Sequence, residues 1–401
     1  MDKIVVIGAG QAGSSLTAKL RGLGHTGPIT LIGEEGAPPY QRPPLSKKYL
    51  LGEMELERLY LRPESFYADN AITLHTAQTA VAIDRADKVV IAGGQQIAYD
   101  QLALTTGSVP RTLPGKIGGE LRGVHVVRTL ADVDAMAPAF TAGTRVLIVG
   151  GGYIGLEAAA VAAQRGMDVT LIEMADRILQ RVAAPETSDY FRALHQAHGV
   201  TIKESCGLDR LTGEDHVTGA VLSDGTEIPV DLVIAGIGIT PATSLAEAAG
   251  LDIDNGIKVD AKGRTSDPAI WAAGDCASFP YHGARIRLES VQNAIDQAEC
   301  VAENMLGAGK DYVPMPWFWS DQYDVKLQIA GLNTGYDRIV TRGSGAAVSF
   351  WYYAGDRLLA VDAMNDARAY MIGKRLIEAG KSPDPALIAD ADADLKPLLK
   401  G

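Results

Sequence analysis

The sequence predicts an α/β protein with two similar nucleotide-binding domains and a smaller C-terminal α+β domain. Three observations support this prediction. A pattern of apolar strand, glycine-rich turn and helix begins at residue 4 and again at residue 145, and each copy is followed by a similar closing strand. Near residue 317 the composition changes and new strand-like runs begin. Internal repeats of this size indicate duplicated domains.

The first copy opens with residues 4–7 (IVVI), which are apolar throughout, as expected of a strand buried on both faces of a parallel sheet. The turn that follows is Gly8-Ala-Gly10-Gln-Ala-Gly13, and leucines at 16, 20 and 23 then recur at helical spacing. Residues 29–33 form a second strand that ends at Glu34 and Glu35. Together these segments make one βαβ unit.

The second copy repeats this order from strand 145–149 through Gly150-Gly-Gly152-Tyr153-Ile154-Gly155 to strand 168–172 and Glu173. The closing strands match as well, since 100–110 (DQLALTTGSVP) and 231–241 (DLVIAGIGITP) share the spacing of Asp, Gly and Pro. In each copy, a strand-like run lies between the βαβ unit and the closing strand, at 88–92 in the first copy and at 217–222 in the second. The sequence therefore predicts two Rossmann-like dinucleotide-binding domains, one over 1–110 and 241–316 and the other over 111–240.

The predicted third domain covers 317–401. Strand-like runs at 325–330, 347–353 and 358–362 precede a helical pattern over 366–379. The polar tail 389–396 (ADADADLK) is expected to be frayed.

The glycines and acids of both repeats fit dinucleotide binding. The first glycine permits a tight turn, the second lets the backbone approach a pyrophosphate, and the third allows close helix–strand packing. Glu34 and Glu173 stand where a carboxylate hydrogen-bonds the ribose, so Glu173 favours NADH over NADPH. Arg177 and Arg181 either soften that preference or are solvated surface charges. Glycine loops without a nucleotide remain the alternative, which the complete context of both copies disfavours.

Composition excludes other classes of function. With 37 Lys and Arg against 49 Asp and Glu, the net charge of −12 argues against a general nucleic-acid binder. Three cysteines, Cys206, Cys276 and Cys300, form no CxxC motif or disulfide framework. No leader precedes the first strand and no apolar stretch reaches the roughly 20 residues of a membrane helix, so we expect a cytoplasmic protein without a membrane partner. No metal-ligand cluster stands out, and bound cofactors are expected to supply the chemistry.

A third segment, 265–275 (TSDPAIWAAGD), is similar to the second FAD fingerprint of two-dinucleotide flavoproteins, in which the final Asp binds the ribityl chain. Asp275 could instead cap a following helix.

Seven segments together carry a resemblance to a known family. The whole chain resembles the FAD-dependent, NADH-dependent ferredoxin reductases of bacterial oxygenase systems, which have a glutathione-reductase-like fold. The segments are GAGQAG (8–13), YQRPPLSKKYL (40–50), GGGYIGLE (150–157), AGIGITP (235–241), AAGDCA (272–277), RLESVQNAIDQA (287–298) and PWFWSDQYDVKLQIAG (316–331). The resemblance implies FAD, NADH and electron transfer to a [2Fe–2S] ferredoxin that serves a Rieske-type oxygenase or cytochrome P450, as in aromatic hydrocarbon catabolism. It also implies a monomer or weak dimer.

The resemblance assigns roles residue by residue. Lys47 and Glu157 are expected to form the environment of flavin and nicotinamide without acting as acid or base. For FAD the implied residues are Gly8, Gly10, Ala12, Gly13, Glu34, Arg42, Lys47, Ala80, Arg128, Asp275, Val291 and Trp319. For NADH they are Gly150, Gly152, Tyr153, Ile154, Gly155, Glu157, Glu173, Gly236, Gly238 and Glu289.

Residue chemistry agrees on Lys47. The two prolines before Leu45-Ser46-Lys47 restrict the backbone that leads into this segment, so Lys47 could point inward. An inward lysine needs a carboxylate partner, and Glu157 is the candidate. The alternative is a surface lysine, with Glu157 and Glu289 as exposed helix glutamates.

The expected ferredoxin partner is acidic and calls for a basic surface. Candidates are Arg285, Arg287, Lys310, Lys326, Arg338 and Arg342. Trp317, Trp319 and Tyr323 either shorten an electron path or pack the third domain. Other functions stay open: an NADH-binding flavoprotein resembling apoptosis-inducing factor, or a reductase of rubredoxin or oxygen. Related oxidases carry a reactive cysteine where Ser46 stands, which counts against oxygen.

Overall fold

The computed structural model describes residues 1–399, and the chain forms two compact units. The first unit contains 1–42, 54–109 and 239–314, and the second contains 43–53, 110–238 and the chain from 315 onward. Among residues 1–399, no helix is both long and apolar enough to cross a membrane.

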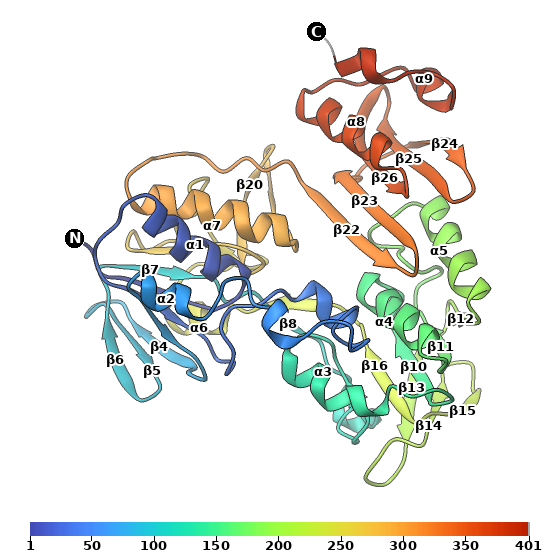
Figure 1. The fold of residues 1–401 in the computed structure, drawn as a ribbon, viewed down its shortest axis with the longest axis horizontal. Helices are drawn as coiled ribbons and strands as arrows, with labels where there is room; N and C mark the ends of the chain where they lie inside the picture. The colour runs from blue at the N-terminus through green and yellow to red at the C-terminus, as the bar shows by residue number, and fades with distance from the viewer. Residues whose placement is uncertain (400–401) are drawn as a thin grey trace. The chain divides into compact units, whose positions relative to one another are not determined.

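The first unit is built on a five-stranded parallel sheet of order β19-β7-β1-β2-β3. Helices α1 (Gln11–Gly22) and α7 (Val291–Met305) pack side by side (Figure 1). The sheet strands are β1 (Ile4–Ile7), β2 (Ile29–Ile32), β3 (Ile72–His75), β7 (Gln101–Leu104) and β19 (Ile270–Ala272). Around them lie α2 (Ser65–Asp69), β4 (Ala80–Asp84), β5 (Val89–Ala92), β6 (Gln95–Ala98), α6 (Ser244–Ala248), β18 (Ile257–Lys258), β20 (Ala277–Tyr281) and β21 (Ala284–Ile286).

The second unit contains an equivalent parallel sheet of order β12-β11-β10-β16-β9. Its strands are β9 (Val124–His125), β10 (Arg145–Val149), β11 (Asp168–Ile172), β12 (Thr201–Lys203) and β16 (Leu232–Ala235). The accompanying elements are α3 (Leu130–Met136), α4 (Tyr153–Gln164), α5 (Pro185–Ala197), β13 (Leu208–Thr212), β14 (Gly219–Leu222) and β15 (Glu227–Pro229). The short strands β8 (Ser108–Pro110) and β17 (Ile239–Pro241) pair with each other.

The two sheets share one topology. Strand β1 or β10 lies in the middle, with the next strand of the βαβ unit on one side and the closing strand, β7 or β16, on the other. In both, the glycine turn leaves the carboxyl end of the central strand, where nucleotides bind in such sheets. The predicted Rossmann-like fold is confirmed. One detail was wrong: α1 ends at Gly22, so Leu23 is 46% exposed and does not join the buried face.

The C-terminal domain belongs to the second unit and has an antiparallel sheet of order β22-β23-β26-β25-β24, on which α8 (Ala367–Glu378) packs. The strands are β22 (Trp317–Gln322), β23 (Val325–Gly331), β24 (Arg338–Ser344), β25 (Ala347–Ala354) and β26 (Arg357–Met364). Strands β22 and β24 were not among the predicted strands. Strand β24 consists mostly of polar residues and glycine, so its sequence lacks the alternation of apolar and polar residues that indicates a strand.

The tail of this domain corrects the expectation of a frayed end. Helix α9 (Pro385–Ala389) precedes Leu395, which is 2% exposed in the domain core. Arg342 donates to the carbonyl groups of Ile388, Asp390, Ala391 and Ala393. The tail is therefore held by one apolar anchor and by an arginine that satisfies its backbone, neither of which the polar composition reveals.

Strand β26 carries a buried carboxyl group, Asp362, which is 1% exposed. It accepts hydrogen bonds from Thr187 of α5 at 2.7 Å and from Tyr352. Burial raises the pKa of Asp362 to about 6, although both hydroxyl donors oppose that shift. Because the folded protein holds this proton more tightly than the unfolded chain, the associated stabilisation is complete below about pH 4. It is lost as the pH rises through 6.

We therefore expect Asp362→Asn to remove a pH-dependent part of the stability. Between pH 4 and pH 7, the unfolding free energy of the variant relative to wild type should rise by on the order of 2–3 kcal/mol. Thermal or urea unfolding at several pH values measures this. Asp356→Asn, at a fully exposed carboxylate of the turn between β25 and β26, is the matched control. A constant difference between Asp362→Asn and wild type across this range would contradict the prediction.

Candidate functional site

The first glycine turn is sterically committed. Gly8 has a φ of +111°, and a Cβ there would lie 2.1 Å from the Thr105 carbonyl oxygen. A Cβ on Gly13 would lie 2.1 Å from the carbonyl oxygen of Gly8. Gly10 differs, since a Cβ there would meet no atom of the protein within 4 Å. Two glycines are thus required by the fold, and the one between them faces open space.

The second turn repeats this arrangement. Gly150 has a φ of +107°, and its Cβ would lie 2.4 Å from the carbonyl oxygen of Gly236. A Cβ on Gly155 would lie 2.1 Å from the carbonyl oxygen of Gly150. Gly152 again faces open space.

Gly10 and Gly152 are the N-cap residues of α1 and α4, and neither helix start receives a side-chain cap. Such helix starts present backbone N–H groups and a positive dipole end to any anion in that space. Ala12, in the first turn of α1, adds only a methyl group. A dinucleotide pyrophosphate fits both turns, one in each unit.

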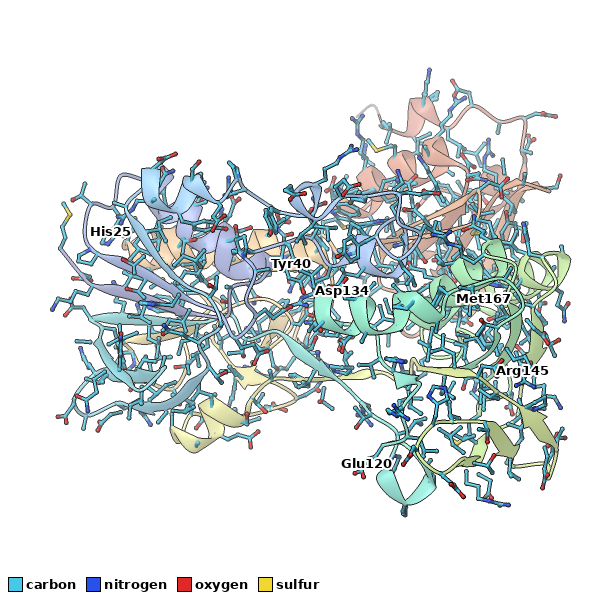
Figure 2. The ribbon with its side chains drawn as sticks, turned by 60° about the horizontal axis from the view of Figure 1, so that its bottom comes forward. His25, Tyr40, Glu120, Asp134, Arg145 and Met167 are labelled. Carbon is cyan, nitrogen blue, oxygen red and sulfur yellow. The ribbon has the colours of Figure 1, made fainter. Side chains whose placement is uncertain are left out.

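The acids at the strand ends differ in their surroundings. Glu173 accepts hydrogen bonds from the backbone N–H of Gly151 at 2.7 Å and of Ala175 at 2.8 Å, so its carboxylate lies at the glycine turn. Glu34 is exposed after β2. Its neighbour Glu35 pairs with Arg42 at 2.6 Å and accepts a hydrogen bond from Tyr40, which Figure 2 labels. Arg42 is one of the predicted FAD residues, whereas Glu35, which restrains it, carried no predicted role beyond ending the strand.

The two arginines after Glu173 also differ. Arg177 donates to the Ser188 hydroxyl and to the carbonyl of Ala183, so it holds its loop in place and is not a solvated charge. Arg181 is exposed, and its Nη2 would lie 3.9 Å from a Cβ on Gly238.

Within the first unit, Asp275 accepts a hydrogen bond from the Ser108 hydroxyl at 3.0 Å. It does not cap a helix, because β20 follows it and α7 is capped by Ser290. Val291 is the first residue of α7, and Ala80 the first of β4. Glu289 precedes α7, is half-exposed and pairs with Arg287 at 2.6 Å.

The second unit brings Lys47 and Glu157 together. The Lys47 Nζ lies 2.9 Å from a Glu157 oxygen, and their side chains are 17% and 3% exposed. Glu157 also accepts hydrogen bonds from Ser46 at 2.8 Å and Ser320 at 2.7 Å. The expected ion pair is present, and the surface alternatives for both residues are wrong. Serines 46 and 320 were missed as partners because their spacing in sequence carries no signal.

The remaining predicted residues of this unit lie on α4, β22 and α3. Ile154 is 46% exposed at the start of α4. The Tyr153 ring lies 5.0 Å from Phe318 of β22, and burial raises the pKa of its hydroxyl well above the usual range. On β22, Trp319 is 5.5 Å from Trp317. Arg128 precedes α3 and donates its backbone N–H to Asp132. The hydroxyl of Tyr49 donates a hydrogen bond to Asp134 of α3. Figure 2 labels Asp134.

Comparison with known proteins assigns the family. The pattern described as pyridine nucleotide-disulphide oxidoreductase matches residues 2–298, and the pattern described as reductase C-terminal matches 317–399. The chain belongs to the pyridine nucleotide-disulphide oxidoreductases.

Relatives of this oxidoreductase cover nearly its whole length. A ferredoxin–NAD(P)(+) reductase of Sphingomonas is 45% identical, over 96% of this chain and 94% of the relative. Rhodocoxin reductase of Rhodococcus erythropolis is 42% identical, over 98% and 93%. The solved structure of the covalent putidaredoxin reductase–putidaredoxin complex contains a chain that superposes with a TM-score of 0.96 at 40% identity, over 99% and 98%.

Despite the family name, the cysteines of this oxidoreductase form no redox pair. Cys206, Cys276 and Cys300 are free and buried. Burial raises the pKa of the Cys276 and Cys300 thiols, which disfavours the thiolate that disulfide exchange requires.

The six candidate cations of the expected basic docking surface differ in their contacts. Five of the six are engaged within the protein, and Lys326 is exposed. Arg285 contacts Asp254 and two carbonyls, Arg287 pairs with Glu289, Lys310 with Glu303, Arg338 lies over Tyr353, and Arg342 holds the tail. Most of these cations stabilise their own domains.

Replacing the open glycines should separate binding from folding. We expect Gly10→Ala to weaken FAD binding and Gly152→Ala to weaken NAD⁺ binding, each by roughly tenfold or about 1.4 kcal/mol, because the new methyl group occupies ligand space. Both backbones are extended and accept alanine. Flavin content and equilibrium titration measure the losses. Gly22→Ala, which also meets no atom within 4 Å at the far end of α1, is the control. Wild-type affinities in both variants would contradict the assignment.

Proposed function

We propose that the protein is an NADH-dependent ferredoxin reductase: NADH and two oxidised [2Fe–2S] ferredoxins yield NAD⁺, a proton and two reduced ferredoxins. The reduced ferredoxin supplies a Rieske-type oxygenase or a cytochrome P450. The observation that carries this proposal is the presence of two complete dinucleotide cradles in one chain, joined to a C-terminal domain of the reductase type. The names of the relatives favour ferredoxin as the acceptor.

FAD is assigned to the first cradle, with Gly8, Gly10, Ala12, Gly13 and Glu34 at its adenosine and pyrophosphate part. Its other proposed contacts are Arg42, Lys47, Ala80, Arg128, Asp275, Val291 and Trp319. NADH is assigned to Gly150, Gly152, Tyr153, Ile154, Gly155 and Glu173, with Glu157, Gly236, Gly238 and Glu289 toward nicotinamide. The corresponding domains are 1–110 with 241–316 for FAD, 111–240 for NADH, and 317–401.

FAD held by the first cradle would supply the chemistry that couples a two-electron donor, NADH, to a one-electron acceptor, the ferredoxin. The chain's residues contribute orientation and electrostatics. The helix N-termini bind the pyrophosphates, and Glu173 selects a free ribose 2′-hydroxyl. Glu157 and Lys47 form an ion pair that restrains both side chains, and Glu157 also accepts hydrogen bonds from Ser46 and Ser320. No general acid or base is assigned. The active species is a monomer or weak dimer.

The test is NADH oxidation by the FAD-loaded protein with cytochrome c as final acceptor, with and without a bacterial [2Fe–2S] ferredoxin. We expect strong dependence on ferredoxin and slower turnover with NADPH, because Glu173 repels the 2′-phosphate. Rubredoxin and oxygen serve as acceptor controls. Faster turnover with rubredoxin than with ferredoxin would identify rubredoxin as the acceptor. Slow turnover with every acceptor and a long-lived charge-transfer band would favour a binding-signal flavoprotein.

Glu157→Ala should slow reduction of the flavin by NADH at least tenfold while leaving electron transfer from chemically reduced enzyme to ferredoxin unchanged. The substitution removes the carboxylate that pairs with Lys47, and it also removes the residue proposed to close over the nicotinamide. Stopped-flow absorbance separates the two steps, and Glu157→Gln keeps the side-chain volume. Glu204→Ala removes another paired carboxylate of the same sheet domain and is the control. An unchanged reduction rate would remove Glu157 from the site.

A further inference from the structure

A continuous chain of buried hydrogen bonds leads away from Glu157 within the second unit. Ser320 donates to Glu157 at 2.7 Å, and Gln322 contacts Ser320 at 3.2 Å. The other end of the Gln322 amide lies 2.8 Å from Nε2 of His195 on α5. The His195 Nδ1 lies 3.1 Å from the hydroxyl of Tyr323. The chain thus joins α4, strand β22, helix α5 and the turn between β22 and β23.

The direction of every donor in this chain follows from the charge at its end. A carboxylate only accepts, so the Ser320 hydroxyl donates its single hydrogen to Glu157. Ser320 must then accept from Gln322, which places the amide nitrogen toward the serine and the amide oxygen toward His195. His195 therefore donates from Nε2, and its Nδ1 accepts from Tyr323. All four dipoles point at the carboxylate.

The chain is shielded from water over most of its length. Glu157, Ser320, Gln322 and His195 are 3%, 0%, 1% and 0% exposed. Burial lowers the pKa of His195 to about 4, so the ring is neutral near pH 7, as the donor order requires. Aligned hydrogen bonds in a low-dielectric interior polarise one another. At the outer end, the Tyr323 ring stacks on His198 with centroids 3.7 Å apart.

We propose that Gln322 and His195 are positioning residues that act through Ser320 to hold Glu157 charged and oriented, so that the C-terminal hairpin β22–β23 regulates the nicotinamide site. This inference rests on the proposed function for the role of Glu157. The four residues beyond Glu157 are assigned no contact with the substrate; they are Ser320, Gln322, His195 and Tyr323. Their effect is transmitted through the one hydrogen bond that Ser320 donates.

Other charged and titratable groups surround this chain of hydrogen bonds. On the elements packed against α4, the charged or titratable side chains are Lys47, which contacts Glu157 directly, and Arg145 and Asp168 at the starts of β10 and β11. Arg145 is paired with Asp231. Asp321 of β22 lies on the opposite strand face from Ser320. Tyr153 lies one turn before Glu157. His198 stacks on Tyr323, and its charge contributes to the lowered pKa of His195.

The test is a graded series of variants in the FAD-loaded enzyme: Ser320→Ala, Gln322→Leu and Tyr323→Phe. Two properties are followed against pH, the rate of flavin reduction by NADH and the dissociation constant of NAD⁺, which needs no turnover. Ser320→Ala should raise the apparent pKa of the acidic limb by about one unit, because a donor to a charged group is lost. Gln322→Leu should raise it by a few tenths, and Tyr323→Phe by less.

A double-mutant cycle distinguishes transmission from general destabilisation. Because Gln322 acts through Ser320, its shift should vanish in the Ser320→Ala background. Ser349→Ala removes another buried serine of the same sheet, one that accepts from Trp351, and should leave the pH profile unchanged. A full shift from Gln322→Leu in the double variant, or no shift in the single variant, would overturn the proposal.

The tautomer of His195 gives a readout that is independent of activity. Nitrogen-15 NMR of labelled histidines should show His195 neutral and protonated at Nε2, and Gln322→Leu should change that state. An Nδ1–H tautomer in the wild type would reverse the donor order and overturn the proposal. If Gln322→Leu does not fold, Tyr323→Phe tests the same chain. If NADH does not reduce the flavin of the wild-type enzyme, the proposed function is wrong. The measurements of NAD⁺ binding and of the His195 tautomer would still test the chain of hydrogen bonds.

Discussion

The buried carboxylate of Glu157 is the interaction on which the arrangement of the second unit depends. A charge at 3% exposure is tolerated only with donors around it, and here they come from Lys47, Ser46 and Ser320. These donors lie on a loop distant in sequence and on the C-terminal domain. Satisfying one carboxylate therefore fixes two segments, the loop that carries Ser46 and Lys47 and strand β22, against α4. Removing Lys47, the one cation among these donors, would leave an uncompensated buried charge, which is more costly than losing a surface ion pair.

The glycine cradles follow a different rule, because they depend on space and not on charge. At Gly13 and Gly155 the helix approaches the preceding turn so closely that a Cβ would collide with a carbonyl oxygen. The open positions Gly10 and Gly152 leave the helix starts to a ligand. The same steric solution occurs in both sheets, which explains why the repeat is readable in the sequence.

The C-terminal domain contacts α5 of the second unit through polar groups. Asp362 accepts from Thr187, and Gln322 bonds to His195, with all four side chains at most 1% exposed. Two of them, Asp362 and His195, have pKa values displaced by burial toward their neutral forms. Buried polar networks of this kind demand complete pairing, and they make the position of the domain sensitive to single substitutions.

The sequence by itself determined the two βαβ units, the glycine spacing and the strand-end acids, because these follow local periodicity and backbone sterics. It also placed Lys47 with Glu157, although only through a family resemblance. Tertiary structure decided the rest. The pairing of Glu35 with Arg42 closes a short loop. The anchoring of the tail by Arg342 and the chain from Tyr323 to Glu157 join residues far apart in sequence. Such pairings leave no periodic signal, because hydrogen bonds between side chains depend on where the folded backbone places them and not on their spacing along the chain.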